Sequence, residues 1–282
     1  MTAALFLLDA GRLTGATPGQ TIVVDGAEGR HAATVKRIEP GEPVLLADGS
    51  GVVAECETVA AAADRLEVRI VAVREEHPGR PRVTLVQALA KGDRDDQAIE
   101  AATELGVDRI VPWQAERSIV RWKGERAARS HAKWERTAAA AAKQARRAVV
   151  PDVLPLADLE ALLGQVGPED LVLVLHEQAR NPLSREVPAR LPDPQGRGRV
   201  LLVVGPEGGI SPEETRRLVA AGAHPVRLGP EVLRTSTAGA AALAVLQVLS
   251  GHWSQLGPGS EGADPDGTDP LTPDPDEPAA SS

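Results

Sequence analysis

The chain contains several short runs of consecutive aliphatic residues, and these runs limit what its larger part can fold into. Residues 171–175 read Leu-Val-Leu-Val-Leu, and residues 200–204 read Val-Leu-Leu-Val-Val. A strand that is apolar on both faces has to be covered on both, as happens when helices pack on either side of a parallel sheet. We therefore predict an α/β domain with strands at 83–88, 109–113, 171–175, 200–204 and 225–228, and with helices at 95–105, 127–147, 212–221 and 237–249.

The first 77 residues show a different pattern, in which short alternating segments are separated by turns. The turns include Pro40-Gly41 and Asp48-Gly49-Ser50-Gly51, where glycine allows the positive φ angles of tight hairpins. We predict a small antiparallel β-barrel over 1–77, with strands at 21–24, 42–47, 51–59 and 65–71. The polar, proline-containing stretch 75–81 predicts a boundary, followed by a second domain over 78–255.

The last segment, residues 256–282, is rich in Pro, Gly, Asp and Ser and has no apolar periodicity. Such a sequence buries too little apolar surface to offset its chain entropy, so we predict an acidic disordered tail. The formal net charge is −9, and the tail holds seven acidic residues and no basic one. Residues 1–255 are therefore close to neutral.

Composition argues against several classes of protein. No apolar run approaches the roughly 18 residues of a membrane-spanning helix, and the N-terminus lacks a secretory signal pattern, so we expect a cytoplasmic protein. Cys56 is the only cysteine, which rules out an internal disulfide or a thiolate zinc cage, and we expect no metal. With one Phe and no Tyr, the chain is a poor candidate for RNA readers that stack bases on sheet aromatics.

Positive charge is concentrated in residues 116–147, which hold ten basic and three acidic residues. Lys and Arg placed on phosphates release counterions and add affinity that is independent of nucleic-acid sequence. This segment is either a phosphate-binding surface or a solvated helix face, and its charge alone does not decide between them.

A glycine-rich turn, Gly205-Pro206-Glu207-Gly208-Gly209, follows the predicted strand 200–204. Ser211, Pro212 and Glu214 then form the pattern of a capping box with proline at the first helical position. Ligands of open α/β sheets bind at the carboxyl ends of strands, where glycines allow close approach to the backbone and Glu207 offers an acceptor. The alternative is an ordinary strand-to-helix turn, since neither a dinucleotide-binding fingerprint nor a Walker A motif is present.

A second loop closes the next predicted strand and leads into the apolar helix 238–249. Thr235, Ser236 and Thr237 are predicted to cap this helix. Arg234 lies just before them, and a cation beside the positive end of a helix is unfavourable unless an anion or a developing negative charge lies nearby. Because both loops follow neighbouring strands, we expect them to form one pocket.

With other motifs along the chain, these loops resemble the RsmE family of 16S ribosomal RNA uracil-N3 methyltransferases, which belongs to the SPOUT class. The resemblance covers nearly all of residues 1–255. Two departures are Ala3-Ala4-Leu5-Phe6, where the family often has Arg, and Ser236, where it commonly has Glu. The ordered matches are Arg30-His31, Val35-Lys36-Arg37, Pro40-Gly41, Gln87 to Arg94, Ala102 to Val107, Glu116-Arg117-Ser118, Trp134, Lys143 to Pro151, Gly205 to Gly209 and Leu233-Arg234-Thr235.

The resemblance implies a PUA-like β-barrel followed by an α/β SPOUT domain with a trefoil knot, a rare topology. It also implies a homodimer that uses S-adenosylmethionine to methylate N3 of one uridine in 16S rRNA of the small ribosomal subunit. Two other functions stay open: a SPOUT enzyme that modifies another base or a ribose 2′-hydroxyl, and a non-catalytic ribosome-assembly factor.

The resemblance also implies roles for individual residues. Arg234 is the catalytic candidate, because its guanidinium can stabilise negative charge on the uracil ring. The cofactor-binding candidates are Leu175, His176, Gly205, Pro206, Glu207, Gly208, Gly209, Leu228, Gly229, Leu233, Thr235, Ser236, Thr237 and Ala238. The RNA-binding candidates are Arg30, His31, Lys36, Arg37, Lys91, Arg94, Arg117, Lys143, Arg146 and Arg147.

Overall fold

The computed structural model describes residues 3–76, 81–193 and 198–254. The predicted tail and part of the predicted boundary, residues 77–80, lie outside them. The N-terminal part is a five-stranded sheet of order β1-β3-β4-β5-β2, built from β1 (Ala4–Leu7), β2 (Thr21–Val24), β3 (Pro43–Ala47), β4 (Val52–Ala62) and β5 (Arg65–Glu75). Short helical turns, α1 (Gly26–Arg30) and η1 (His31–Val35), follow β2 and were not predicted.

The four predicted strands of this sheet are confirmed, with small changes at their ends, but the wholly antiparallel arrangement is wrong. The unpredicted strand β1 pairs in parallel with β3, Phe6 opposite Leu46, whereas the other three pairings are antiparallel. The segment forms a strand of this sheet because its Phe6 side chain is fully buried in the aliphatic core there. The only cysteine, Cys56, is buried in the same core, and burial raises the pKa of its thiol to about 12.

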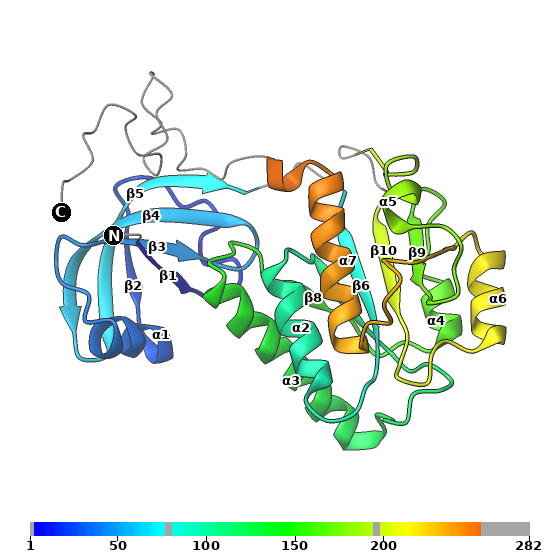
Figure 1. Cartoon of the computed structure of the whole chain (residues 1–282). Helices are drawn as coiled ribbons and strands as arrows, with labels where there is room; N and C mark the ends of the chain where they lie inside the picture. The colour runs from blue at the N-terminus through cyan, green and yellow to red at the C-terminus, as the bar shows by residue number, and fades with distance from the viewer. Residues whose placement is uncertain (1–2, 77–80, 194–197, 255–282) are drawn as a thin grey trace, which may run out of the picture.

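The second part is a six-stranded, wholly parallel sheet of order β11-β9-β10-β6-β7-β8 (Figure 1). The bounds of four strands agree with the prediction: β6 (Val83–Ala88), β7 (Arg109–Trp113), β9 (Leu171–Leu175) and β10 (Val200–Val204). A two-residue strand, β8 (Asp152–Val153), was not predicted. The last strand, β11 (His224–Val226), ends before Arg227, which instead hydrogen-bonds to Asn181 and Leu183.

Helices cover both faces of this sheet, as the aliphatic runs predicted. One face packs against α2 (Arg94–Glu104), α3 (Gly124–Gln144), α5 (Leu183–Glu186) and α7 (Thr235–Leu249). The other face packs against α4 (Leu159–Leu163) and α6 (Pro212–Ala220). Helix α3 stops short of its predicted end at residue 147 because Arg146 takes a left-handed φ of 54°.

The chain crosses the sheet twice near its end. After β10, helix α6 leads to β11 at the far edge, and α7 then returns across β10 and β6 to pack on α2. This return brings the start of α7 against the loop that follows β10. The short η2 (His252–Ser254) ends the described chain, and none of the described helices is both long and apolar enough to cross a bilayer.

The two parts of the molecule are joined through a short backbone contact. Gly51 N donates to Ala148 O at 3.2 Å, and Val150 N donates to Gly49 O at 3.1 Å. Nearby, the Lys143 ammonium pairs with the Glu28 carboxylate at 2.6 Å, which links α3 to α1. These contacts hold the N-terminal sheet beside the carboxyl end of α3 (Figure 1).

Candidate active site

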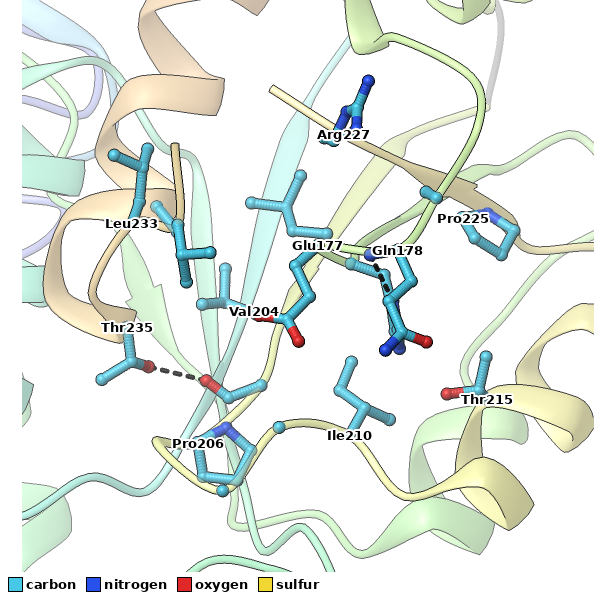
Figure 2. A pocket seen from close by; sticks show the side chains of 18 of the residues that line it. Glu177, Gln178, Val204, Pro206, Ile210, Thr215, Pro225, Arg227, Leu233 and Thr235 are labelled. Carbon is cyan, nitrogen blue, oxygen red and sulfur yellow. Dashed lines mark hydrogen bonds between the residues drawn. The ribbon is translucent and has the colours of Figure 1, made fainter. Parts of the chain in front are cut away.

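A cavity of about 1110 Å³ opens at the carboxyl edge of β9, β10 and β11. Most of its walls come from the loops after these three strands, from α6 and from the start of α7 (Figure 2). Pockets for drug-sized ligands measure about 300–1000 Å³, so this cavity has room for a nucleoside and part of a second ligand. All predicted cofactor-binding residues line it except Gly229, Ser236 and Thr237.

The loop after β10 owes its shape to glycine. A Cβ atom on Gly205 would lie 2.7 Å from Cγ1 of Ile210, and Gly209 has a positive φ of 73°. The N–H of Gly209 donates to Pro206 O at 2.8 Å, which closes the turn. We call residues 205–211 the glycine loop.

The predicted capping box at the start of α6 is confirmed. The Ser211 hydroxyl accepts from Glu214 N at 3.2 Å, and the Glu214 carboxylate accepts from Ser211 N at 2.9 Å. Pro212 occupies the first helical position, as predicted. The cap fixes the direction in which the glycine loop enters the helix.

The predicted cap of α7 by Thr235, Ser236 or Thr237 is wrong. Arg234 occupies the N-cap position, and no side chain caps the helix. The buried Thr235 hydroxyl instead donates to Gly205 O at 2.7 Å and accepts from Gln87 Nε2 at 3.0 Å. A buried polar group such as the Gln87 amide needs a hydrogen-bond partner within the protein, whereas the N–H groups at an exposed helix end can bond to water. The hydroxyl thereby links the ends of β6 and β10 to the start of α7.

Arg234 is exposed and lines the cavity. Within the described part of the chain, its guanidinium makes no hydrogen bond or ion pair, although its backbone carbonyl accepts from Thr237 N and Ala238 N. A free guanidinium at the positive end of α7 favours an anion or a developing negative charge in front of it.

Glu207 binds the loop that follows β6. Its Oε1 accepts from Arg94 Nη1 at 2.7 Å and from Lys91 N at 3.1 Å. Burial raises the pKa of Glu207, but hydrogen bonds from its own backbone, from Lys91 and from Arg94 outweigh burial and hold the pKa below its ordinary value. The carboxylate is therefore charged, and it holds two predicted RNA-binding residues beside the glycine loop.

Asp95 stabilises the same loop from its inner side. Its Oδ1 accepts from Ala90 N at 2.8 Å, and the side chain is 9% exposed. Burial raises the pKa of Asp95 to about 7, with the nearby Asp96 and Glu207 carboxylates adding to the effect. This residue was not among the predicted ones, because its burial depends on the packing of α2.

The far side of the cavity contains polar residues that the sequence analysis missed. Figure 2 shows the side chains of Glu177 and Gln178 extending into the cavity opposite Thr235, with Thr215 on the wall formed by α6. Glu177 and Gln178 follow the predicted strand 171–175, so their position after a parallel strand could have identified them. His176, which was predicted, lines the cavity and accepts from Gln178 N through Nδ1.

The predicted RNA-binding residues fall into three groups. Arg94 and Arg117 line the cavity, and Lys91 lies beside it. Arg30, His31, Lys36 and Arg37 lie on or beside the helical turns of the N-terminal part, where the His31 ring packs on Phe6 with centroids 6.2 Å apart. The third group lies at the end of α3: Lys143, Arg146 and Arg147.

Two members of the third group are engaged inside the protein. Lys143 pairs with Glu28, as described above, and the Arg147 guanidinium donates to the carbonyls of Thr103 and Val107 at 2.7 and 2.9 Å. Arg146 is exposed. The positive charge of residues 116–147 is thus shared between structural contacts and the surface.

Comparison with protein families gives two matches. A family model described as an RNA methyltransferase domain matches residues 77–247, and one described as an RNA methyltransferase PUA domain matches residues 24–71. The ribosomal RNA small subunit methyltransferase E of Mycobacterium bovis is 44% identical over 257 residues, which cover 90% of this chain and 94% of that protein.

Two solved structures are similar over most of the chain. The ribosomal RNA small subunit methyltransferase E of Neisseria gonorrhoeae, bound to S-adenosyl methionine, is 31% identical with a TM-score of 0.75, covering 88% of this chain and 98% of that one. A methyltransferase of Legionella pneumophila in complex with the same cofactor is also 31% identical, with the same coverage and a TM-score of 0.73.

Proposed function

Because the chain belongs to the ribosomal RNA small subunit methyltransferase E family, we propose that it methylates N3 of one uridine in 16S rRNA of the small ribosomal subunit, using S-adenosylmethionine. The observation that carries this proposal is the cavity between the glycine loop and residues 228–238. The choice of cofactor is supported by the 31% identity to a relative whose crystal structure contains bound S-adenosyl methionine. The proposed site of action is the cytoplasm.

The residues around the cavity suit this cofactor. Leu175, Leu228 and Leu233 offer apolar walls to an adenine ring, while the glycine loop brings backbone N–H and C=O groups close to the ligand. At Gly209 nothing lies within 4 Å of where a Cβ would be, so a ligand can approach the backbone. When bound, S-adenosylmethionine supplies an electrophilic methyl group on its sulfonium centre.

The protein then has to present the uracil ring and stabilise the charge that develops on it. N3 becomes a nucleophile only as its proton leaves, and a stacked base cannot reach the cavity, so the uridine must be held outside its helix. We assign the stabilising role to Arg234, whose guanidinium is unpaired within the described residues and borders the cavity. Its backbone position at the start of α7 is fixed because Thr235 is tied to Gly205.

We assign rRNA binding to the cations around the cavity and on the N-terminal part. Arg94 and Arg117 line the cavity, and the exposed Arg37 and Arg146 extend the positive surface to either side of the domain junction. In this proposal residues 1–77 form a PUA-like barrel that docks rRNA, and residues 78–255 form the methyltransferase domain.

We also propose a trefoil knot and a homodimer. The return of α7 across β10 and β6, with Thr235 bound to both strand ends, supports a C-terminal segment threaded through a loop. Exposed apolar side chains at Val232, before α7, and at Val248 and Trp253, at its other end, support a dimer that covers the length of this helix. Sedimentation analysis tests the dimer directly.

The test of the proposed function is Arg234→Ala. We expect methyl transfer to unmodified small subunits to be lost, while calorimetry shows S-adenosylmethionine binding within a few fold of the unaltered protein. Arg190→Ala is the matched control, because Arg190 is an exposed cation that pairs with Glu186 away from the cavity. Retained turnover in Arg234→Ala contradicts the assignment of this residue.

A further inference from the structure

Glu214 joins two loops that lie far apart in the sequence. The residue is 4% exposed, and each of its two carboxylate oxygens accepts a hydrogen bond from a different backbone N–H. Oε2 accepts from Ser211 N at 2.9 Å, within the capping box, and Oε1 accepts from Glu116 N at 2.7 Å, 98 residues away. The cap of α6 uses only the first contact, so it leaves the second one unexplained.

The second contact anchors the loop 114–122, which lies between β7 and α3. The two ends of this loop are tied by Gln114, whose side chain donates to Val120 O at 2.9 Å and accepts from Trp122 N at 3.2 Å. Trp122 packs edge-to-face on Trp134 in the core, with ring centroids 5.2 Å apart. The loop is thus fixed at its base before any ligand binds.

The tip of this loop touches the glycine loop. Arg117 Nη1 donates to Gly208 O at 3.2 Å, and a Cβ on Gly208 would lie 3.3 Å from Cβ of Arg117. Glu214 therefore holds the backbone next to Arg117 beside Ser211, where the glycine loop ends, while Gly208 in the middle of that loop meets the Arg117 side chain. The two loops are therefore in direct contact through Arg117 and are tied together through Glu214.

We propose that Glu214 is a positioning residue that couples cofactor binding at the glycine loop to RNA binding by Arg117. A cofactor bound against the glycine loop favours the loop position that Arg117 contacts, so Arg117 is held in place for a phosphate and each ligand strengthens the binding of the other. This inference rests on the proposed function, since it takes S-adenosylmethionine and rRNA as the two ligands.

Two substitutions at Glu214 test the coupling. Glu214→Gln keeps the size of the side chain, but its amide group presents a donor to one of the two N–H groups, which then loses its acceptor. Because glutamine can keep either contact, Glu214→Ala, which removes both, is measured alongside. Ser211→Ala is the matched control, because it breaks the other half of the capping box and leaves the contact with Glu116 in place.

The measurement is the affinity for S-adenosylhomocysteine, the demethylated product, which cannot donate a methyl group, with and without saturating unmodified small subunits. In the unaltered protein we expect the subunits to tighten this binding about fivefold or more, a typical size for coupling between two sites. The coupling factor is the ratio of the two affinities, measured with and without subunits. It should approach one in Glu214→Ala, fall in Glu214→Gln and stay as in the unaltered protein in Ser211→Ala. Melting temperatures measured in parallel separate loss of coupling from loss of fold.

A double-mutant cycle adds a second readout. Arg117→Ala should weaken subunit binding in the unaltered and Ser211→Ala proteins, but much less in Glu214→Ala, where Arg117 is already displaced. Equal coupling factors in the Glu214 and Ser211 variants overturn this inference and leave the proposed function intact. Failure of the unaltered protein to bind either ligand contradicts the proposed function, and this inference falls with it.

Discussion

The hydroxyl of Thr235 offers a sharp test of how the site is built, through the substitution Thr235→Val. Valine has nearly the shape of threonine but can neither donate to Gly205 O nor accept from Gln87 Nε2. Both contacts join the start of α7 to the carboxyl ends of the two central strands. We therefore expect a loss of stability larger than for a surface substitution.

The size of the effect follows from the partners that are left behind. Losing a hydrogen bond costs about 1 kcal/mol net where the remaining group keeps another partner, and roughly 1–3 kcal/mol where that group is left without one. Gln87 is fully buried, but its amide keeps a bond to Ala88 O at 3.2 Å, which limits the loss on that side. With about 1 kcal/mol lost at Gln87 and about 1–3 kcal/mol at Gly205 O, we expect Thr235→Val to lower the free energy of unfolding by about 2–4 kcal/mol.

Urea unfolding measures this loss as a shift in midpoint at an unchanged slope. Thr235→Ser is the control, because it keeps the hydroxyl and removes one methyl group, at a cost of about 1 kcal/mol. If Thr235→Val unfolds within about 0.5 kcal/mol of the unaltered protein, or if serine is as damaging as valine, the hydroxyl does not hold the three segments together.

Three further predictions concern other parts of the molecule. Burial raises the pKa of Asp95 to about 7, so the stability contributed by its protonated form is present below about pH 4 and is lost as the pH rises to about 7. In urea unfolding, the stability of Asp95→Asn should therefore rise relative to that of the unaltered protein between these two pH values. A difference in stability that stays constant with pH contradicts this. Gly51→Ala should lower the melting temperature more than Gly19→Ala. Both glycines have a positive φ, but only at Gly51 would the added methyl group meet a backbone carbonyl oxygen, at 3.1 Å. Equal decreases in melting temperature refute the steric argument. Arg147→Ala should cost about 1–3 kcal/mol of stability, because it removes two hydrogen bonds to backbone carbonyls. Arg146→Ala should instead reduce the dependence of rRNA affinity on salt concentration, lowering the slope of log affinity against log salt by about one. The reverse pattern would exchange the roles of the two residues.

The strands of the parallel sheet could be predicted because their signal is local. The runs that form β9 and β10 are apolar throughout and end before His176 and Gly205, so their bounds could be read directly. The runs that form β6 and β7 are mostly apolar, with Thr84, Gln87 and Arg109 as the polar exceptions. The capping box at Ser211 and Glu214 is equally local, since its partners are three residues apart. These features depend little on what packs against them.

The features that were missed depend on distant partners. The run 4–7 is a strand only because β3 lies beside it, and Thr235 leaves the helix cap because Gly205 O and the buried Gln87 amide lie within its reach. Likewise, Lys143 and Arg147 carry the charge expected of RNA-binding residues, but the fold places acceptors next to them. The family resemblance, together with charge, identified the residues near the cavity without showing which cations are free to meet RNA.

The most direct test of the proposed activity is the location of the transferred methyl group. Small ribosomal subunits that lack the modification are incubated with the protein and S-adenosylmethionine, and the digested 16S rRNA is mapped by mass spectrometry. The proposed function predicts one new methyl group on N3 of a single uridine, and none with Arg234→Ala. A methyl group on a ribose 2′-oxygen or on another base, or no transfer at all, would contradict it.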